Sequence, residues 1–395
     1  MPAMDRASSP PPGGARHAPP PTRRAGGARR TLEPLFAAAD VQLDGARPWD
    51  IQVRDEQMFD RILAQGTLGA GEAYMDGQWT CERLDELSVR LVRADLASRL
   101  RPLPLLLHHL RARLFNLQSE ARAWRVGREH YDLGNDFYAA MLDRRMTYTC
   151  AFWRDAATLD QAQEHKLDLV CRKLMLQPGQ RVLDIGCGWG SFMQYAAQHH
   201  GVRCVGVTVS AEQAALARER CAGWPVEVRL ADYRTLDEPF DRVVSLGMFE
   251  HVGQKNHGRF MAVVRRCLHP WGLALLHTIG RNEHGHGTDP WIHAYVFPNG
   301  ELPTIAQIGS ACERRFVVED LHNFGPDYDR TLLCWHANVE AAWPRFAAQL
   351  GERFHRLWRY YLLTCAGAFR ARDIQLWQWV LSPPGRPGVY PRLAH

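Results

Sequence analysis

A short glycine-rich segment in the middle of the chain constrains the fold more than any other feature. It comprises Val182, Leu183, Asp184, Ile185, Gly186, Cys187, Gly188, Trp189 and Gly190. Residues 181–185 predict a short buried strand, and residues 191–199 predict the helix that follows it. The three glycines therefore occupy a strand-to-helix turn, where backbone N–H groups point outward and a ligand can lie against bare backbone.

The spacing of these glycines separates two kinds of nucleotide-binding fold. A dinucleotide-binding fingerprint needs glycine at its first, third and sixth positions, whereas the sixth position here is Ser191. The D-x-G-x-G-x-G spacing instead resembles S-adenosylmethionine-dependent methyltransferases, and this resemblance implies S-adenosylmethionine as the cofactor. Glycine turns also occur where a helix packs tightly on a sheet, so a purely structural role is the alternative.

The first 30 residues differ in composition from the rest of the chain. They hold seven prolines, four glycines and six arginines but one acidic residue, and such a segment buries too little apolar surface to fold. Their net charge of +5 equals that of all 395 residues, so the remainder is neutral. A neutral folded part does not favour nucleic acid as a partner. We expect a disordered, solvated tail, with contact to an anionic surface as the alternative.

Cysteine spacing and hydropathy indicate the cellular location. The ten cysteines form no Cys-x-x-Cys pair, which favours reduced, mostly buried thiols and offers no zinc pattern. The longest apolar runs, residues 103–110 and 272–279, are far shorter than the ~20 residues of a membrane-spanning helix. No apolar stretch of the kind found in secretory signals follows the arginine pairs at Arg23 and Arg29. We therefore expect a cytoplasmic protein.

Residues 31–127 predict a small, mainly helical N-terminal domain with its connecting segment. Residues 56–65 and 85–100 carry apolar side chains at helical spacing. In the connection, residues 111–128 combine five arginines and one acid with interleaved leucine and aromatic side chains. Such a basic amphipathic stretch predicts peripheral binding to the inner face of an anionic membrane. A helix packed on the protein's own core is the alternative.

Residues 128–395 predict the catalytic domain, an α/β fold with a doubly wound, mostly parallel sheet. Strands are expected at residues 181–185, 203–207, 226–230, 242–247 and 273–279, with helices between them. Further strands are expected at residues 316–321 and 331–335, together with aromatic-rich helices to about Phe369. Ligands bind at the carboxyl ends of parallel strands, so the residues after each strand are the site candidates.

Residues after the second and third strands are candidates for holding the cofactor's nucleoside. Thr208 stands where an acidic residue commonly holds the ribose, so Thr208 and Gln213 are expected to bind it by neutral hydrogen bonds. Ser210 and Gln213 also fit a helix-capping box, which is the structural alternative. Asp232 is a candidate acceptor for the adenine amino group and Tyr233 a candidate cover for the adenine ring. A surface turn is the alternative for that pair.

Polar residues also follow the next two strands. Glu250 and His251 are adjacent, and His277 lies at the end of the following strand. Ends of adjacent strands converge, and burial there shifts pKa values, so these groups form a candidate catalytic site. An ordinary polar contact is the alternative for a lone Glu-His pair. No metal-binding spacing accompanies these residues.

Several motifs together resemble cyclopropane-fatty-acyl-phospholipid synthases. Besides the glycine loop they lie at residues 130–138, 148–153, 247–253, 289–292, 297–300, 322–329 and 365–377. In the N-terminal part they lie at residues 71–77 and 112–118. The resemblance covers about residues 31–381, and its N-terminal part favours the phospholipid branch over the mycolic acid cyclopropane synthases. The arginine-rich tail departs from the family pattern.

This resemblance implies transfer of a methylene from S-adenosylmethionine to the cis double bond of an unsaturated acyl chain in a membrane phospholipid. An alkene is a weak nucleophile, so the site must exclude water and align the reacting carbons. Electron-rich walls are expected to stabilise the carbocation, and a weak base suffices to remove the last proton. The resemblance also implies a homodimer.

The same resemblance implies roles for individual residues. A bicarbonate ion is the implied base, held by the side chains of Glu250, His277 and Tyr328 and by the backbone of Cys150 and Ile279. Cofactor contacts are implied for Tyr148, Thr149, Gly186, Gly188, Thr208 and Gln213. Cys365 matches a cysteine often marked as catalytic in the family. Direct methyl transfer needs no thiol, so we expect a structural role for Cys365.

Two alternatives stay open at this stage. A methyltransferase of the same fold would act on another acceptor, yielding a methyl- or methylene-branched fatty acid or methylating a small amine. A non-catalytic relative would keep the fold and bind lipid only. The presence of Glu250, His277 and Tyr328 together with the glycine loop argues against the second alternative.

Overall fold

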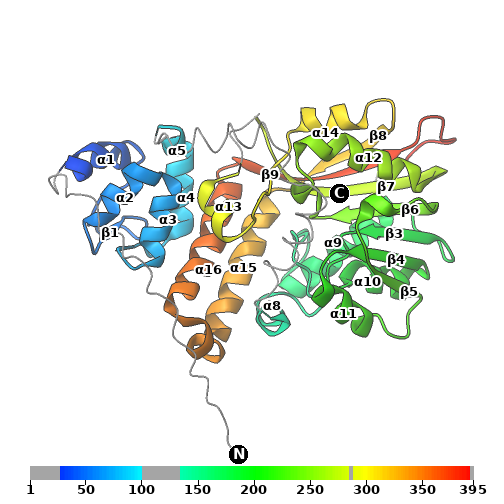
Figure 1. Ribbon diagram of the computed structural model, residues 1–395, viewed down its shortest axis with the longest axis horizontal. Helices are drawn as coiled ribbons and strands as arrows, with labels where there is room; N and C mark the ends of the chain where they lie inside the picture. The colour runs from blue at the N-terminus through cyan, green and yellow to red at the C-terminus, as the bar shows by residue number, and fades with distance from the viewer. Residues whose placement is uncertain (1–26, 100–133, 284–287, 392–395) are drawn as a thin grey trace, which may run out of the picture.

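The computed structural model of the chain describes residues 27–99, 134–283 and 288–391. Figure 1 shows a small helical N-terminal domain at one end, an α/β domain at the other, and two long helices between them. The predicted boundary after residue 127 and the basic stretch 111–128 lie outside the described residues.

The N-terminal domain packs short helices around one apolar core. They are α1 Gly27–Ala38, α2 Gln57–Gln65, α3 Thr67–Met75, α4 Leu84–Arg93 and α5 Leu96–Arg99, with the antiparallel pair β1 Gln52–Val53 and β2 Trp79–Thr80. The predicted helix at residues 56–65 is confirmed. The one at 85–100 is divided at Asp95, whose φ is +48°. Helix α1 begins at Gly27, within the segment predicted to be disordered; residues 1–26 lie outside the described residues.

Among the described residues, seven strands form one sheet in the order β5-β4-β3-β6-β7-β9-β8. The parallel strands are β3 Arg181–Ile185, β4 Arg203–Thr208, β5 Val226–Leu230, β6 Phe240–Leu246 and β7 Leu268–Arg281. Strand β9 Ile374–Ser382 runs antiparallel between β7 and β8 Val317–Asn323. The predicted doubly wound, mostly parallel sheet is confirmed. The chain direction across the sheet reverses at β3, which places a ligand crevice beside its carboxyl end.

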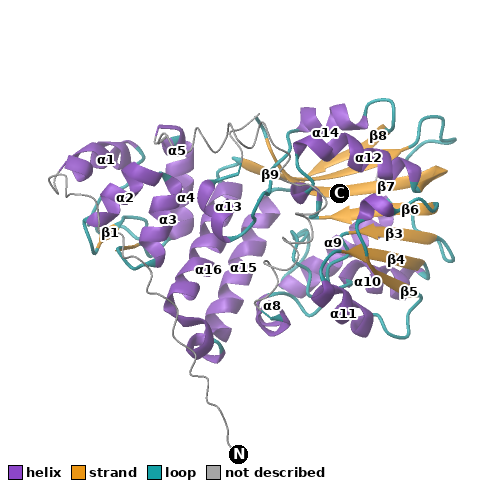
Figure 2. Cartoon of the chain, viewed as in Figure 1, coloured by secondary structure: helices purple, strands orange, loops and turns teal. Residues whose placement is uncertain are grey.

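Helices cover both faces of the sheet (Figure 2). Helices α9 Leu159–Lys173, α10 Ser191–His200 and α11 Ala211–Arg220 share one apolar core. Helices α12 His257–Arg266 and α14 Ile305–Cys312 share the core on the other face. Strands buried on both sides carry near-continuous apolar runs, which is why β3, β4 and β6 are recognisable in the sequence. Short 3-10 turns lie at Tyr233–Thr235, Phe249–His251, Gln254–Asn256 and Trp343–Arg345.

A third group of helices separates the sheet from the N-terminal domain. It comprises α8 Asn135–Met141, α13 Pro290–Tyr295, α15 Pro326–Ala342 and α16 Ala347–Arg370, the last interrupted at Gly351 with φ +74°. A core rich in aromatic side chains joins these helices to one another and to the strand ends. Helix α16 also packs against α3 and α4. The small domain therefore contacts the rest of the chain along α16.

Two expectations for the C-terminal part were wrong. Residues 331–335, predicted as a strand, lie in α15. A short apolar run does not distinguish a strand from a buried helix, whereas Pro326 at the first turn and Asp327 behind it are helix-start signals. Strand β9 was not predicted, because a strand buried between two neighbours shows no alternation of polar and apolar residues.

The cysteines and the helices bear on the predicted environment. All ten cysteines are free, and eight of them are buried, which agrees with the expected buried thiols. Within the described ranges, no helix is both long and apolar enough to cross a bilayer.

Candidate active site

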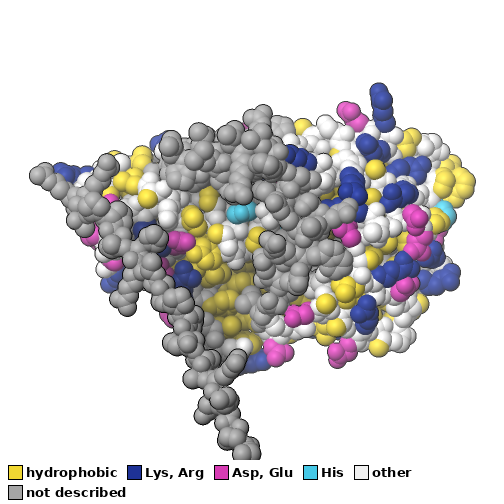
Figure 3. Space-filling view, in the orientation of Figure 1, with side chains coloured by type: hydrophobic (Ala, Val, Ile, Leu, Met, Phe, Trp, Pro, Cys, Tyr) yellow, Lys and Arg dark blue, Asp and Glu magenta, His cyan; other side chains and the backbone are white. Residues whose placement is uncertain are grey.

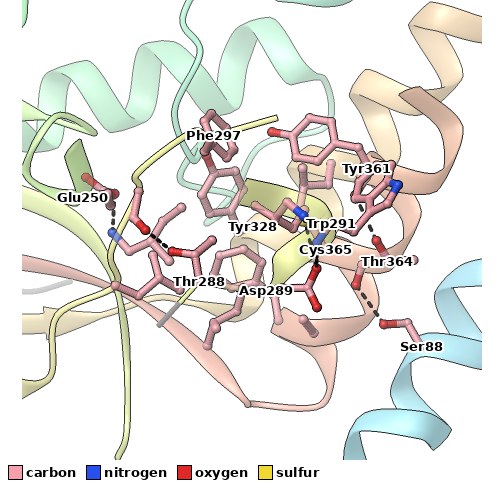
Figure 4. A pocket seen from close by; sticks show the side chains of 18 of the residues that line it. Ser88, Glu250, Thr288, Asp289, Trp291, Phe297, Tyr328, Tyr361, Thr364 and Cys365 are labelled. Atoms are coloured by element: carbon pink, nitrogen blue, oxygen red, sulfur yellow. Dashed lines mark hydrogen bonds between the residues drawn. The ribbon is translucent and has the colours of Figure 1, made fainter. Parts of the chain in front are cut away.

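A cavity of about 760 Å³ lies at the carboxyl ends of the central strands and extends into the N-terminal domain. Its walls include the glycine loop after β3, the segments after β6 and β7, and side chains of α15 and α16. Figure 4 shows side chains from these elements pointing into one space. The volume lies in the range of ~300–1,000 Å³ that ligand sites occupy.

The glycine loop forms one end of this cavity. Gly186, Gly188 and Gly190 have φ values of +85°, +52° and +84°, which side chains rarely allow. The Gly186 N–H donates to the Val207 carbonyl at 2.9 Å, so the loop is anchored on β4. A Cβ added at Gly188 would meet no described atom within 4 Å, so this bare backbone faces open space. The loop thus fits the tail of a nucleotide-like cofactor.

Buried polar side chains support the segment that faces the glycine loop. Lys166 on α9 is fully buried, and its Nζ donates to Thr149 Oγ1 at 2.6 Å. Gln163 on the same helix donates to the carbonyls of Thr147 and Thr149 at 3.2 and 2.8 Å. Sequence reasoning missed both residues. Their signal is two long polar side chains, three residues apart, on the apolar face of a helix.

Asp184 joins this buried group. It is 2% exposed and lines the cavity, and its Oδ1 has no hydrogen-bond partner in the part of the chain that the structure describes. Burial raises the pKa of Asp184 to about 7, opposed by the nearby Lys166 charge. Burial lowers the pKa of Lys166 to about 8. An unpaired acceptor at the cavity wall is suited to a hydrogen bond from a bound ligand.

We expect Lys166→Met to weaken S-adenosylmethionine binding about tenfold, because the Thr149 segment loses the hydrogen bond that orients it. Lys173→Met is the matched control. Lys173 is equally buried on the same helix but pairs with Asp320 at 3.0 Å, and it is not among the described residues that line the cavity. Calorimetric titration with the cofactor compares the two variants. Equal affinities would show that Lys166 only supports the fold.

Side chains predicted for the cofactor divide into two groups. Tyr148, Thr149 and Gln213 line the cavity, and Tyr148 Oη lies 3.0 Å from Tyr361 Oη. Thr208 does not line it directly; its hydroxyl donates to Gln213 Oε1 at 2.9 Å and so orients that amide. Ser210 accepts from the Gln213 N–H as the cap of α11, so the capping role is confirmed as well.

The predicted adenine pair is placed differently. Asp232 forms an ion pair with Arg234 at 2.7 Å and caps the turn at Tyr233–Thr235. The Tyr233 ring packs on Phe260 in the core behind the sheet, 5.4 Å between centroids. Neither Asp232 nor Tyr233 is among the described residues that line the cavity. Local contacts thus occupy both side chains in this structure.

Glu250 and His277 come together from adjacent strand ends, as predicted. Glu250 Oε1 accepts from the Ile279 N–H at 2.6 Å. Gln378 on β9 lies behind His277, with its Nε2 3.2 Å from Nδ1, so the imidazole proton is placed on Nε2. Within the described ranges, Glu250 Oε2 and His277 Nε2 are buried without a hydrogen-bond partner. Sequence reasoning missed Gln378, because it lies on the strand that was not predicted.

The remaining predicted catalytic residues surround this pair unequally. Tyr328 lines the cavity beside Phe369, 4.6 Å between ring centroids, and Figure 4 shows both Tyr328 and Glu250 at the same part of it. Cys150 is fully buried and does not belong to the described lining; its Sγ donates to the Ala151 carbonyl. Cys365 lines the cavity, but burial raises the pKa of its thiol to about 12. A protonated thiol is a poor nucleophile, which agrees with the structural role expected for Cys365.

Burial sets the protonation states at the centre of the site. Burial raises the pKa of Glu250 to about 7, against the bond from Ile279. Burial lowers the pKa of His277 well below its usual range and raises that of Tyr328 well above it. At neutral pH the site therefore offers a neutral imidazole N–H and a carboxyl group near its titration point. Together they fit a small oxyanion that carries one proton.

The Glu250 pKa predicts a pH-dependent stability difference. Folding raises the pKa from 4.5 to about 7, so the stability contribution is fully present below pH 4.5 and lost as the pH rises through about 7. Glu250→Gln removes this loss, and we expect the variant to gain roughly 3 kcal/mol over the wild type across that window. Urea unfolding of both proteins at about pH 5 and about pH 8 measures the gain. A difference that is constant with pH would contradict the prediction.

The sheet order with antiparallel β9, and the glycine loop after β3, define the fold of S-adenosylmethionine-dependent methyltransferases. The sequence profile of the family described as mycolic acid cyclopropane synthetase matches residues 118–379, and the chain belongs to this family. The chain is an S-adenosylmethionine-dependent methyltransferase.

Individual relatives agree with this membership. The cyclopropane-fatty-acyl-phospholipid synthase of Escherichia coli strain K12 is 52% identical over 360 residues, which cover 89% of this chain and 93% of the relative. The cyclopropane synthase MmaA2 from Mycobacterium tuberculosis superposes with a TM-score of 0.62 at 35% identity and covers 68% of this chain and 99% of its own. The mycolic acid cyclopropane synthase CmaA1, solved with SAH and CTAB, superposes with a TM-score of 0.61 at 34% identity and covers 65% and 97%.

Proposed function

We propose that the protein converts cis double bonds in the acyl chains of membrane phospholipids into cyclopropane rings, with S-adenosylmethionine as the methylene donor and bicarbonate as the base. The observation that carries this is the pair of buried, unpaired polar atoms, Glu250 Oε2 and His277 Nε2, beside the glycine loop in one largely apolar cavity. The similarity to the Escherichia coli enzyme extends through the N-terminal domain and so favours a phospholipid substrate.

The residues present fit the cofactor. The bare backbone at Gly186 and Gly188 would hold its tail, and the Gln213 amide oriented by Thr208 would hold the ribose. Tyr148 and Thr149 would face it from the opposite wall. When bound, S-adenosylmethionine supplies an electrophilic methyl carbon. The chain's own contribution is to fix that position next to the acyl chain and to exclude water from it.

The polar centre fits bicarbonate, which supplies a weak base when bound. His277 Nε2–H would donate to one oxygen, and Glu250 Oε2 would pair with another; Tyr328 would stand beside them. The backbone contact implied for Ile279 competes with its present bond to Glu250, so anion binding would require these two groups to share that N–H. The role implied for the Cys150 backbone remains part of this proposal.

Aromatic side chains surround the position where positive charge would develop on the acyl chain. Tyr328, Phe369 and Tyr361 line the cavity next to Glu250 and His277. The faces of such rings attract a cation, and the attraction is strongest where water is excluded. The same apolar walls fit an acyl chain.

The proposed location is the inner surface of a membrane, reached without a spanning helix, and the proposed assembly is a homodimer. Both follow from the family resemblance, and the basic stretch 111–128 is the candidate lipid contact. Vesicle flotation at rising ionic strength tests the lipid contact, because electrostatic binding weakens with salt. Salt-independent flotation would indicate hydrophobic insertion.

Incubation with S-adenosylmethionine and vesicles of a cis-unsaturated phospholipid tests the activity. Acyl masses and olefinic proton signals are measured together. A gain of CH₂ with loss of the olefin is the expected result. A gain of CH₂ with the olefin retained would indicate a branched product, and no gain despite cofactor binding would indicate another acceptor or a lipid-binding relative.

A further inference from the structure

The cavity does not end at the reacting groups. From Tyr361 and Cys365 its lining continues into the N-terminal domain, where Met58, Leu87 and Leu91 form part of its wall. Figure 3 shows hydrophobic side chains gathered over the central helices, next to this domain. The methyltransferase core alone therefore encloses only part of the space.

Helix α16 borders both parts of the cavity. Tyr361 and Phe369 belong to the core that contains Tyr328, whereas Leu363 belongs to the core of the N-terminal domain. The Ser88 hydroxyl of α4 donates to the Thr364 carbonyl at 2.9 Å, as Figure 4 shows. This bond ties the wall from the small domain to the wall from α16. The two parts of the cavity are thus held in a defined relation.

The N-terminal part of the cavity is chemically suited to hydrocarbon. Its wall consists mainly of aliphatic and aromatic side chains from α2, α3 and α4. The acidic Asp289 at the junction is occupied as the cap of α13, where it accepts from the N–H groups of Trp291 and Ile292. Apolar cavities of this kind stay dry and take up apolar ligands, and leaving them empty costs stability.

We propose that this N-terminal part of the cavity is a hydrocarbon subsite that selects the lipid substrate by the length of its acyl chain. The inference rests on the proposed function. The occupant is either the segment of the reacting chain beyond the double bond or the second acyl chain of the same phospholipid. Both have the chemistry that the wall accepts, and the experiment distinguishes them.

Cavity-filling and cavity-enlarging substitutions test the subsite through chain-length selectivity. Ala70 on α3 lines the cavity, and Ala70→Leu is expected to lower kcat/KM for long-chain lipids about tenfold relative to short-chain lipids. Leu91→Ala is expected to shift the ratio the opposite way. Ala64→Leu, an exposed position on α2 away from the described lining, is the matched control and should leave the ratio unchanged.

Two substrate series identify the occupant. In one, only the number of carbons beyond the reacting double bond changes; in the other, only the length of the saturated second chain changes. A ratio that moves with either series in opposite directions for Ala70→Leu and Leu91→Ala supports the subsite and names the chain. Equal effects on all lipids in both series would overturn it.

A binding measurement separates this inference from the proposed function. Phosphatidylethanolamine with a diazirine at the end of one acyl chain is photolysed with the wild-type protein, and the labelled peptides are mapped. Adducts within residues 57–96 are expected, whether or not turnover occurs. Adducts confined to other residues would overturn the subsite, whereas adducts there without any cyclopropane product would overturn the proposed function alone.

Discussion

Replacing Glu250 by glutamine should lower kcat at least about a hundredfold, because a positioned acid or base contributes about 10² to 10⁴ in rate. The amide keeps the size of the side chain and still accepts from the Ile279 N–H, but it cannot pair with a protonated oxyanion as a carboxyl group does. His277→Ala removes the buried Nε2–H donor and should have a similar effect. Single-turnover product formation on cis-unsaturated vesicles measures both losses.

The controls for these variants separate chemistry from folding. Cofactor affinity and thermal unfolding should stay close to the wild type, because Glu250 and His277 lie beyond the glycine loop. Glu227→Gln, the same change at an exposed residue of β5, should leave kcat unchanged. If both Glu250→Gln and His277→Ala lost cofactor binding, the assignment of these residues to catalysis would fail. Activity that no longer responds to added bicarbonate in the variants would support the proposed anion site.

Gly186→Ala should weaken S-adenosylmethionine binding by about tenfold to a hundredfold. The residue has φ +85°, and a Cβ there would lie 2.8 Å from the Cβ and Cγ atoms of Met248. Such strain costs about 1–3 kcal/mol, and relieving it moves the loop that faces the cofactor. Titration with S-adenosylmethionine measures the affinity directly.

Gly179→Ala is the matched control for backbone strain. Gly179 has φ +82°, a Cβ there would meet no described atom within 4 Å, and it precedes β3 at the far end from the cavity. Both variants should lose thermal stability, but only Gly186→Ala should lose cofactor affinity. Equal affinities in the two variants would mean that the loop does not face the cofactor.

Much of the α/β domain was predictable from the chain itself. Strands buried on both faces appear as short apolar runs, so the first five strands of the sheet were located within a few residues of their observed ends. The site candidates followed from the rule that ligands bind at the carboxyl ends of parallel strands. Glu250, His277 and the glycine loop are indeed brought to one cavity. These patterns are local, so a linear sequence records them.

Other features depend on residues that are distant in the chain. Gln378 sets the proton of His277 from a strand about a hundred residues later (|i−j| = 101), and Lys166 supports Thr149 from a helix whose polar face the sequence does not mark as buried. Tyr233 was placed in the core by its packing against Phe260 and not over a ligand.

The sequence by itself determined the class of enzyme, its cofactor loop and the identity of its reacting groups, because each is written in contiguous residues with fixed spacing. Only the tertiary structure decided which side chains hold those groups, and that the cavity passes along α16 into the N-terminal domain. The physical reason is that burial and unpaired hydrogen-bonding atoms arise when separate elements pack together. No single segment contains that information.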